Sequence, residues 1–234
     1  VIAWLANEKW RMDVFAGHGK IYEASASMMF NIPLNNITKD LRQKGKVAEL
    51  ALGYGGGVGA LVRMGGAAMG LSEVEMERIK VAWRKASPSI VRLWKLCNDA
   101  AIQVLTVGGK VRVNGLCDFY VKNNNLHLVL PSGRPLIYLD AKYNGKSVTY
   151  WGMDQIKKVW CKQDTYGGKL VENIVQAIAR DCLADALLRV DQFGCDIIMH
   201  VHDEIVVECV EGDAEAVAQV LTEFLNCEDR KSVV

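Results

Sequence analysis

The chain has 234 residues, half of them hydrophobic, and its formal net charge at pH 7 is +1. This length and composition are those of a soluble globular protein with a buried core. The near balance of charge excludes a generally basic surface, so any polyanionic partner must be held by local patches of charge.

The cysteines and the apolar runs indicate the cellular compartment in which the protein is expected. No apolar run approaches the roughly 20 residues of a membrane span, and the N-terminus lacks the layout of a signal peptide. The seven cysteines include no Cys-x-x-Cys pair, which gives a structural zinc site little support and fits free thiols. We therefore expect a cytoplasmic protein without a membrane partner. The cysteines are Cys97, Cys117, Cys161, Cys182, Cys195, Cys209 and Cys227.

The first quarter of the chain is predicted to be helical. Residues 1–30 show helical apolar spacing with a break at residues 17–20. Thr38 can cap a helix that runs from about Lys39 to Leu52, and the glycine-rich segment 53–59 ends it.

Two further helix starts follow. Ser72 and Glu75 have the spacing of a capping box, and Ser87 with Pro88 fits a cap followed by a first-turn proline. One face of the second helix is apolar: Ile90, Val91, Trp94, Cys97 and Ala101. Several large side chains are expected to pack in the core: Trp83, Trp94, Trp151, Met28, Met29 and Met199.

The pattern changes to strands after the helices. Residues 109–151 predict a small sheet, with turns at Pro131–Arg134 and at Asn144-Gly145. A long helix is expected near 169–192, a strand pair within 195–209, and an amphipathic helix over 213–225.

One predicted helix carries a regular basic and apolar stripe. Its residues recur at a spacing of four: Arg42, Lys46, Leu50 and Tyr54. Lys39 and Lys44 add positive charge near the helix N-terminus, where cations oppose the macrodipole. A bound triphosphate would explain this arrangement, since arginine forks onto phosphate and lysine supplies a point charge. A solvated basic face explains it equally well.

The strand pair within 195–209 carries carboxylates at its bend. The stretch MHVHDEIVVE places Asp203 and Glu204 between two β-branched runs. A carboxylate at a hairpin tip suits Mg²⁺, which proteins hold with one or two carboxylates plus substrate phosphates. Two alternatives remain: Asp203 is simply a turn residue, or His200 and His202 share a strand face in a metal-dependent hydrolase.

These two elements together resemble the DNA polymerase I family, also called family A, and especially its bacteriophage members. The family's second motif is similar to Arg42-x-x-x-Lys46-x-x-x-Leu50-x-x-x-Tyr54-Gly55 and its third to HVHDEIVVE. Segments 19–33 and 165–181 also look like phage-polymerase segments in the same order. The resemblance covers nearly the whole chain.

The resemblance implies an α+β fold and template-directed DNA synthesis. It implies a mostly helical fingers region over residues 1–165, including the small sheet, and a palm part over 166–234. The palm part would carry the catalytic hairpin of an antiparallel sheet. The implied partners are a DNA primer–template and deoxynucleoside triphosphates, in the host cytoplasm if the protein is viral.

The resemblance also implies which residues bind the incoming nucleotide. Arg42 and Lys46 would grip the phosphates of the incoming nucleotide, and Lys46 is also a candidate acid for the departing pyrophosphate. Tyr54 would stack near the nascent base pair. The implied nucleotide-binding set is Arg42, Lys46, Leu50, Tyr54 and His202.

Further implied roles concern the metals and the DNA. Asp203 would hold two catalytic Mg²⁺ ions, with Glu204 in support. The implied DNA-binding set is Tyr54, Gly55, Gln176 and His202, with Gln176 in the duplex minor groove and His202 near the primer end.

The sequence departs from the family's pattern in three places, and one of them, Lys20-Ile21-Tyr22, differs from the version typical of bacterial enzymes and points to a viral relative. The family's first motif, Asp-(Phe/Tyr)-Ser-x-x-Glu-x-Arg, supplies another metal-binding aspartate and would end just before Val1. We therefore expect a fragment that is inactive alone, with the N-terminal part of the polymerase as its partner. Leu50 stands where the family more often has an aromatic residue, which leaves sugar discrimination open. A non-catalytic nucleic-acid-binding module is a further alternative.

Overall fold

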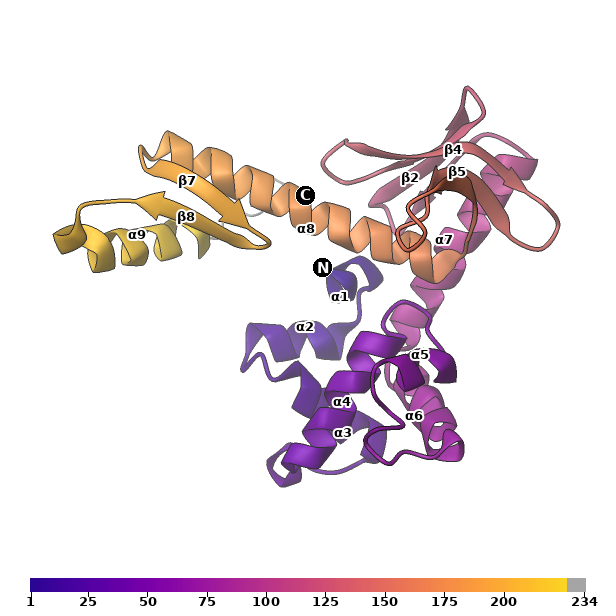
Figure 1. The fold of residues 1–234 in the computed structure, drawn as a ribbon, viewed down its shortest axis with the longest axis horizontal. Coiled ribbons are helices and arrows are strands. Elements are labelled where there is room, and N and C mark those ends of the chain that lie inside the picture. The colour runs from indigo at the N-terminus through magenta and orange to yellow at the C-terminus, as the bar shows by residue number, and fades with distance from the viewer. Residues whose placement is uncertain (227–234) are drawn as a thin grey trace.

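The computed structural model describes residues 1–226 and has three parts (Figure 1). These are a helical part, a six-stranded antiparallel sheet and a small C-terminal lobe; helix α7 leads from the helical part to the sheet, and the long helix α8 leads from the sheet to the lobe. The helices before the sheet are α1 (Ile2–Ala6), α2 (Lys9–Ala16), α3 (Ile21–Phe30), α4 (Lys39–Leu52), α5 (Val58–Arg63), α6 (Glu73–Ala86) and α7 (Pro88–Thr106), with a short 3-10 turn at Leu34–Asn36.

The sheet and the C-terminal lobe complete the chain. The sheet strands, each paired with the next, are β1 (Lys110–Val113), β2 (Cys117–Lys122), β3 (Asn125–Val129), β4 (Pro135–Tyr143), β5 (Val148–Met153) and β6 (Trp160–Thr165). The lobe follows α8 (Gly167–Gln192) and contains β7 (Asp196–Val201), β8 (Glu204–Glu208), a 3-10 turn (Glu211–Asp213) and α9 (Ala214–Asn226).

Most predicted elements are confirmed. The basic helix spans Lys39–Leu52 with the Thr38 hydroxyl accepting from the Leu41 amide, as expected. The capping box of Ser72 and Glu75 is present in full. The predicted sheet was too short, because β6 extends it to Thr165. Residues 154–159, between β5 and β6, contain a turn in which the Asp154 carboxylate accepts from two backbone amides.

The cap of α7 differs from the prediction. Pro88 does occupy the first turn, but the Ser87 hydroxyl makes no cap hydrogen bond. The Glu8 carboxylate caps the helix instead, accepting from the amides of Ser89 at 2.8 Å and Ile90 at 3.3 Å. A negative charge at this end is favoured by the helix macrodipole.

One continuous core joins the helical part, the sheet and the first half of α8. Phe119, Leu126 and Leu128 of the sheet are fully buried, since one face of the sheet packs on α7. Trp83 and Trp94 are buried in this core as predicted, and their rings stack with centroids 5.8 Å apart.

Three large side chains that were predicted to be packed are exposed instead. Met28 and Met199 are about half exposed, at 51% and 54%, and Trp151 is 40% exposed. Met28 on α3 and Trp151 on β5 stand on the side of the element that is turned away from the core, whereas Met29 and Val148 on the same elements are buried. No helix in the described part of the chain is long and apolar enough to cross a bilayer.

The helices α3 and α4 are in backbone contact at one glycine. A Cβ at Gly45 would overlap the carbonyl oxygen of Tyr22 on α3. We predict that Gly45→Ala lowers the free energy of unfolding by about 1–3 kcal/mol, because backbone must move to admit the methyl group. Urea titration measures the loss. Gly59→Ala is the matched control, since only the end of Arg63 lies within 4 Å, and its stability should hold or rise.

Burial raises the pKa of several core groups. It raises the pKa of Cys97 to about 12 and of Cys117 to about 11, and the pKa of Tyr138 to about 12. Because these groups keep their protons in the folded chain, the unfolded chain releases protons first as the pH rises. Their contribution to stability is therefore complete below about pH 8.5, the ordinary pKa of an unfolded thiol. It is lost progressively as the pH rises from there through the folded pKa values.

We predict that the protein loses stability on the alkaline side, between about pH 8.5 and about pH 12. Urea midpoints measured across that range should fall steadily. Tyr138→Phe should flatten the fall above about pH 10, the ordinary pKa of tyrosine, while leaving the thiol-dependent part. A midpoint that is constant up to about pH 11 would contradict the burial of these groups.

Candidate functional site

The exposed side of α4 carries most of the predicted nucleotide-binding stripe. Arg42 and Leu50 are exposed and Lys46 is half-buried, while the opposite side of the helix faces the core. Residues four apart drift by about 40° on a helix, so the stripe turns slowly along one surface. The core-facing side consists of Gly45, Val47, Ala48, Ala51 and Leu52.

Two of the cations on α4 already have carboxylate partners. Arg42 Nε lies 2.9 Å from Glu23 Oε1 on α3, and its guanidinium lies over the Tyr22 ring. Lys44 pairs with Asp40 within the helix. An external anion is therefore not the sole explanation for these charges. Lys46 has no ion pair with any residue that the structure describes, so its ammonium is available to a ligand.

Tyr54 lies beyond the helix rather than on it. The helix α4 ends at Leu52, and Tyr54 and Gly55 follow in a turn, with Gly55 at φ +80°. Burial, and then the nearby Glu172 carboxylate, raise the pKa of Tyr54. The Tyr54 side chain is therefore a neutral phenol at physiological pH. The helix ends at Leu52 as predicted, so the spacing of four continues past it to Tyr54 in the turn.

The start of α8 packs directly on this turn. A Cβ at Gly168 would overlap the Tyr54 carbonyl oxygen, and one at Gly167 would overlap that of Trp94 on α7. These glycines allow three backbone segments to meet. Gln176 lies two turns further along α8, where it is exposed and its Nε2 is 3.4 Å from Glu172 Oε1. The structure thus brings Tyr54, Gly55 and Gln176 to the same half of α8.

The remaining predicted residues lie at the tip of the β7–β8 hairpin. Val201 pairs with Glu204, which leaves His202 and Asp203 as a two-residue turn. His202 has φ +52°, a backbone region that residues other than glycine seldom adopt. His202 is therefore outside the strand, and the shared strand face predicted for His200 and His202 is wrong. The His200 ring lies 3.3 Å from the Arg180 guanidinium on α8.

The two carboxylates at this tip are exposed and adjacent. Asp203 also lines a groove of about 780 Å³ between α8, β8 and α9. Within the described residues there is no group of three or more His, Cys, Asp or Glu side chains that could hold a metal. Two adjacent carboxylates do suit Mg²⁺, which completes its shell with water and phosphate oxygens.

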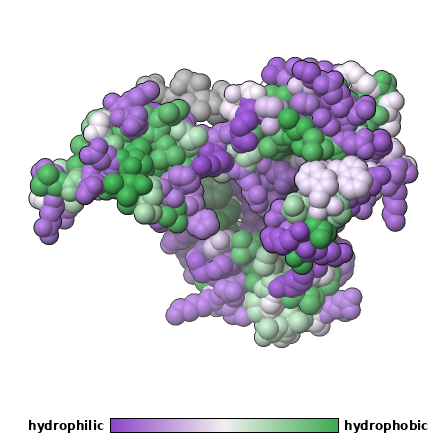
Figure 2. Space-filling view, turned by 45° about the horizontal axis from the view of Figure 1, so that its top comes forward, coloured by the Kyte–Doolittle hydropathy of each residue, from purple (hydrophilic) through white to green (hydrophobic). Residues whose placement is uncertain are grey.

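The two halves of the predicted site lie on different parts of the molecule. The helix α4 belongs to the helical part, and the hairpin belongs to the C-terminal lobe at the far end of α8 (Figure 1). The 26 residues of α8 span about 39 Å, which sets the separation of Tyr54 from the hairpin's base. Figure 2 shows hydrophobic residues gathered on the lobe and a recess between the lobe and the rest of the molecule. The hairpin contributes exposed Ile198, Val201 and Val206.

A buried ion pair that the sequence reasoning missed holds α4 in place. Arg11 on α2 meets Glu49 on α4 in a two-pronged contact with N–O distances of 2.7 and 2.8 Å. The Arg11 side chain is only 3% exposed. Trp83 Nε1 donates to the same carboxylate at 2.9 Å, and Arg11 also donates to the Ser87 hydroxyl. Glu49 stands between Lys46 and Leu50, so this contact fixes the rotation of the stripe.

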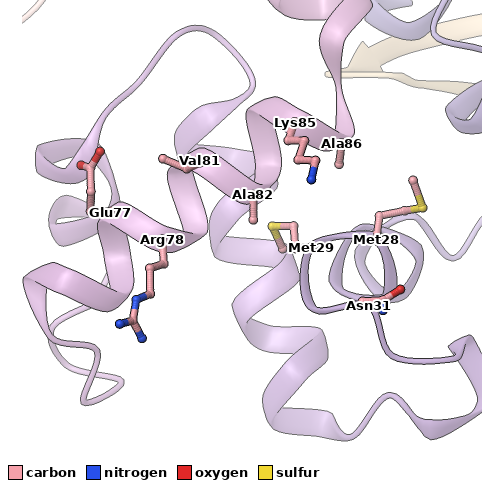
Figure 3. A pocket seen from close by; sticks show the side chains of 9 residues that line it. All are labelled: Met28, Met29, Asn31, Glu77, Arg78, Val81, Ala82, Lys85 and Ala86. Atoms are coloured by element: carbon pink, nitrogen blue, oxygen red, sulfur yellow. The ribbon is translucent and has the colours of Figure 1, made fainter.

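A second groove lies between α3 and α6 (Figure 3). It has a volume of about 700 Å³ and contains none of the residues predicted for the site. Its lining is Met28, Met29, Asn31, Glu77, Arg78, Val81, Ala82, Lys85 and Ala86.

Comparisons with known proteins identify what the chain resembles. It is 50% identical over 223 residues, 92% of its length, to a DNA polymerase of Bacillus phage SP02. The structure matches the polymerase domain of Pol1 from M. smegmatis, solved with DNA primer-template and dNTP, with a TM-score of 0.62 at 18% identity over 96% of the chain. The chain spans about a third of each of these proteins, 34% in both cases. No protein-family profile matches it.

The fold is therefore α+β, as predicted, and matches that of a Pol1 polymerase domain. The particular similarity is to the DNA polymerase of phage SP02, of which the chain matches about a third. The resemblance indicated by the two sequence motifs is confirmed.

The buried Arg11–Glu49 ion pair is expected to contribute to stability. Arg11→Met should lower the free energy of unfolding by about 3–5 kcal/mol, because it leaves the Glu49 charge buried and unpaired. Urea unfolding measures the loss. The double variant Arg11→Met/Glu49→Leu should recover much of it, since no charge then remains in the core. Lys95→Met is the control: it breaks the exposed Lys95–Asp99 pair and should cost no more than about 1 kcal/mol.

Proposed function

We propose that the chain supplies the nucleotide-binding face and part of the catalytic centre of a template-directed DNA polymerase of family A. The observation that carries this proposal is the pairing of two features in one homologous chain. One is an exposed basic stripe on α4, held from behind by a buried ion pair. The other is a two-stranded hairpin that carries two exposed carboxylates, Asp203 and Glu204, next to each other in the sequence at its tip.

The stripe on α4 would bind the triphosphate of a deoxynucleotide. Of the two cations in the stripe, Lys46 has no carboxylate partner among the described residues, so it meets the phosphates at least cost. Arg42 would exchange its exposed contact with Glu23 for phosphate, because a surface ion pair contributes little. Lys46 would also protonate the departing pyrophosphate. Leu50, further along the stripe, would pack against the sugar.

Beyond α4, the turn and α8 would hold the DNA. Tyr54 is a neutral phenol beside the start of α8, where its ring would stack on the nascent base pair. Gly55 would let the DNA approach closely, and the exposed Gln176 amide would donate to acceptors in the duplex minor groove. His202, at the hairpin tip, would contact the primer end or the nucleotide.

The hairpin would hold divalent metal through Asp203, with Glu204 in support. Magnesium bound there would neutralise charge on the transferring phosphoryl group, which is the larger part of catalysis in this chemistry. Phosphoryl transfer by two ions needs a further carboxylate, and we assign it to the N-terminal part of the polymerase. Exposure of both carboxylates leaves room for that partner and for the substrate.

Two other functions have less support. A metal-dependent hydrolase that uses His200 and His202 would need both imidazoles on one strand face, but His202 lies in the turn. A non-catalytic nucleic-acid-binding module would give the hairpin carboxylates no role. It predicts that changing Asp203 has no effect on any activity.

The proposal is tested by primer extension. We predict that the purified chain alone extends no primer, and that extension appears when a polypeptide bearing the family's first motif is joined to it or added. In that active protein, Asp203→Asn should lower deoxynucleotide incorporation by about 10³-fold or more, because charge neutralisation is removed from the transition state. DNA affinity, measured by fluorescence anisotropy, should change little.

The matched control is Asp196→Asn, at the exposed base of the same hairpin. It removes an equal charge from β7 and should leave incorporation unchanged. Full incorporation by Asp203→Asn would rule out the metal role and favour the binding-module alternative. Extension by the chain alone would show that its own residues complete the metal site.

A further inference from the structure

The positive charge of the chain is concentrated in the six-stranded sheet. Residues 110–165 contain nine lysine and arginine residues against four aspartates, a net charge of +5. The rest of the chain has nineteen basic and twenty-three acidic residues, a net charge of −4. All nine basic residues of the sheet segment are exposed. The local patch of charge that a polyanion requires is therefore on the sheet.

The sheet has one buried face and one open face. Phe119, Leu128 and Tyr138 point into the core beside α7. Alternate residues on the same strands point the other way and remain accessible to solvent. We call this second surface the open face; its apolar and aromatic residues are Tyr120, His127, Ile137, Leu139, Trp151 and Trp160.

The strand register places these side chains in rows across the open face. Tyr120 pairs with His127, and their rings stack with centroids 5.0 Å apart and planes 10° apart. His127 pairs with Ile137 on the next strand, and Leu139 pairs with Trp151. Trp160 is 55% exposed and pairs with Met153, which follows Trp151 on the same face of β5. Flat rings thus lie on both halves of the open face, with a shift of register between Leu139 and Lys142 in the β4–β5 pair.

Cations stand directly beside these rings. Lys162 pairs with Trp151 across the β5–β6 ladder, and its side chain is exposed. Lys122 follows Tyr120 on the same face of β2. Neither lysine forms an ion pair within the described part of the chain. At the other edge Lys110 and Arg112 share Asp118 between them, so that row keeps a net positive charge.

We propose that the open face binds single-stranded DNA. Unpaired bases would stack on Trp151, Trp160 and the Tyr120–His127 pair, while Lys162 and Lys122 would meet the phosphates. An open sheet with exposed rings and neighbouring cations is a known way of holding unpaired bases, because every base offers a flat face to a ring. A duplex has no such free base faces.

Charge selects this occupant over the other candidates. A second copy of the chain would bring a sheet of the same net charge of +5 against this one, and like charges oppose that contact. The choice of DNA over RNA rests on the proposed function, in which a template strand continues past the duplex as a single strand. The surface itself is independent of the nucleotide site.

The test measures the binding of a fluorescein-labelled oligothymidylate to the purified chain by anisotropy, with a chelator and no nucleotide. Trp151→Ala and Trp160→Ala should each weaken binding by about 10-fold, since one stacked base is lost. Lys162→Gln should weaken it less and should reduce the salt dependence by about one counterion. An unlabelled duplex should compete poorly.

Matched variants keep the result interpretable. Phe15→Ala removes a ring that is 58% exposed on α2, away from the sheet, and should leave the affinity unchanged. Trp151→Phe retains a ring and should recover most of the binding, which separates stacking from a folding defect. If the double variant Trp151→Ala/Trp160→Ala binds as tightly as the parent chain, or if Phe15→Ala weakens binding equally, the proposal is wrong. Because metal and nucleotide are absent, failure of the polymerase proposal would leave this result unaffected.

Discussion

The Arg11–Glu49 ion pair is the constraint on which the arrangement of the helical part depends. A guanidinium that is 97% buried is stable only when its charge is paired. Glu49 pairs the charge, the Ser87 hydroxyl accepts from the guanidinium, and two tryptophan rings lie against it, whereas its Nε has no hydrogen-bond partner among the described residues. These partners come from four different segments. Helix α4 cannot rotate without breaking this contact, so its apolar side stays in the core and its basic stripe stays in solvent.

A second constraint positions the C-terminal lobe relative to α4. The start of α8 has glycines where its backbone packs directly against the backbone of the Tyr54 turn and of α7. The helix then leaves the main core after Ile178, and its later buried residues, Leu183 and Val190, lie outside that core. The hairpin is thus tied to α4 through one rigid helix, and a substrate between the two would be contacted by both.

Local signals in the sequence were sufficient for much of this. Thr38, the box of Ser72 and Glu75, and the two β-branched runs around the hairpin each act within a few residues of chain, and each element formed as predicted. Contacts between distant residues could not be predicted in the same way. Arg11 and Glu49 are 38 residues apart, and Glu8 caps a helix 81 residues away. Trp151 was misplaced for the same reason, since alternation gives a strand two faces without saying which one is covered.

The distribution of charge explains how a nearly neutral chain can serve a polyanion. A surplus spread evenly over this surface would attract any nucleic acid weakly, whereas +5 on one sheet and −4 elsewhere give the molecule an oriented field. The rest of the chain has a net charge of −4, so the attraction for phosphate is concentrated on the sheet. The rings on the open face, rather than the charge, would then distinguish unpaired bases from duplex, because stacking requires a base plane that no complementary strand covers.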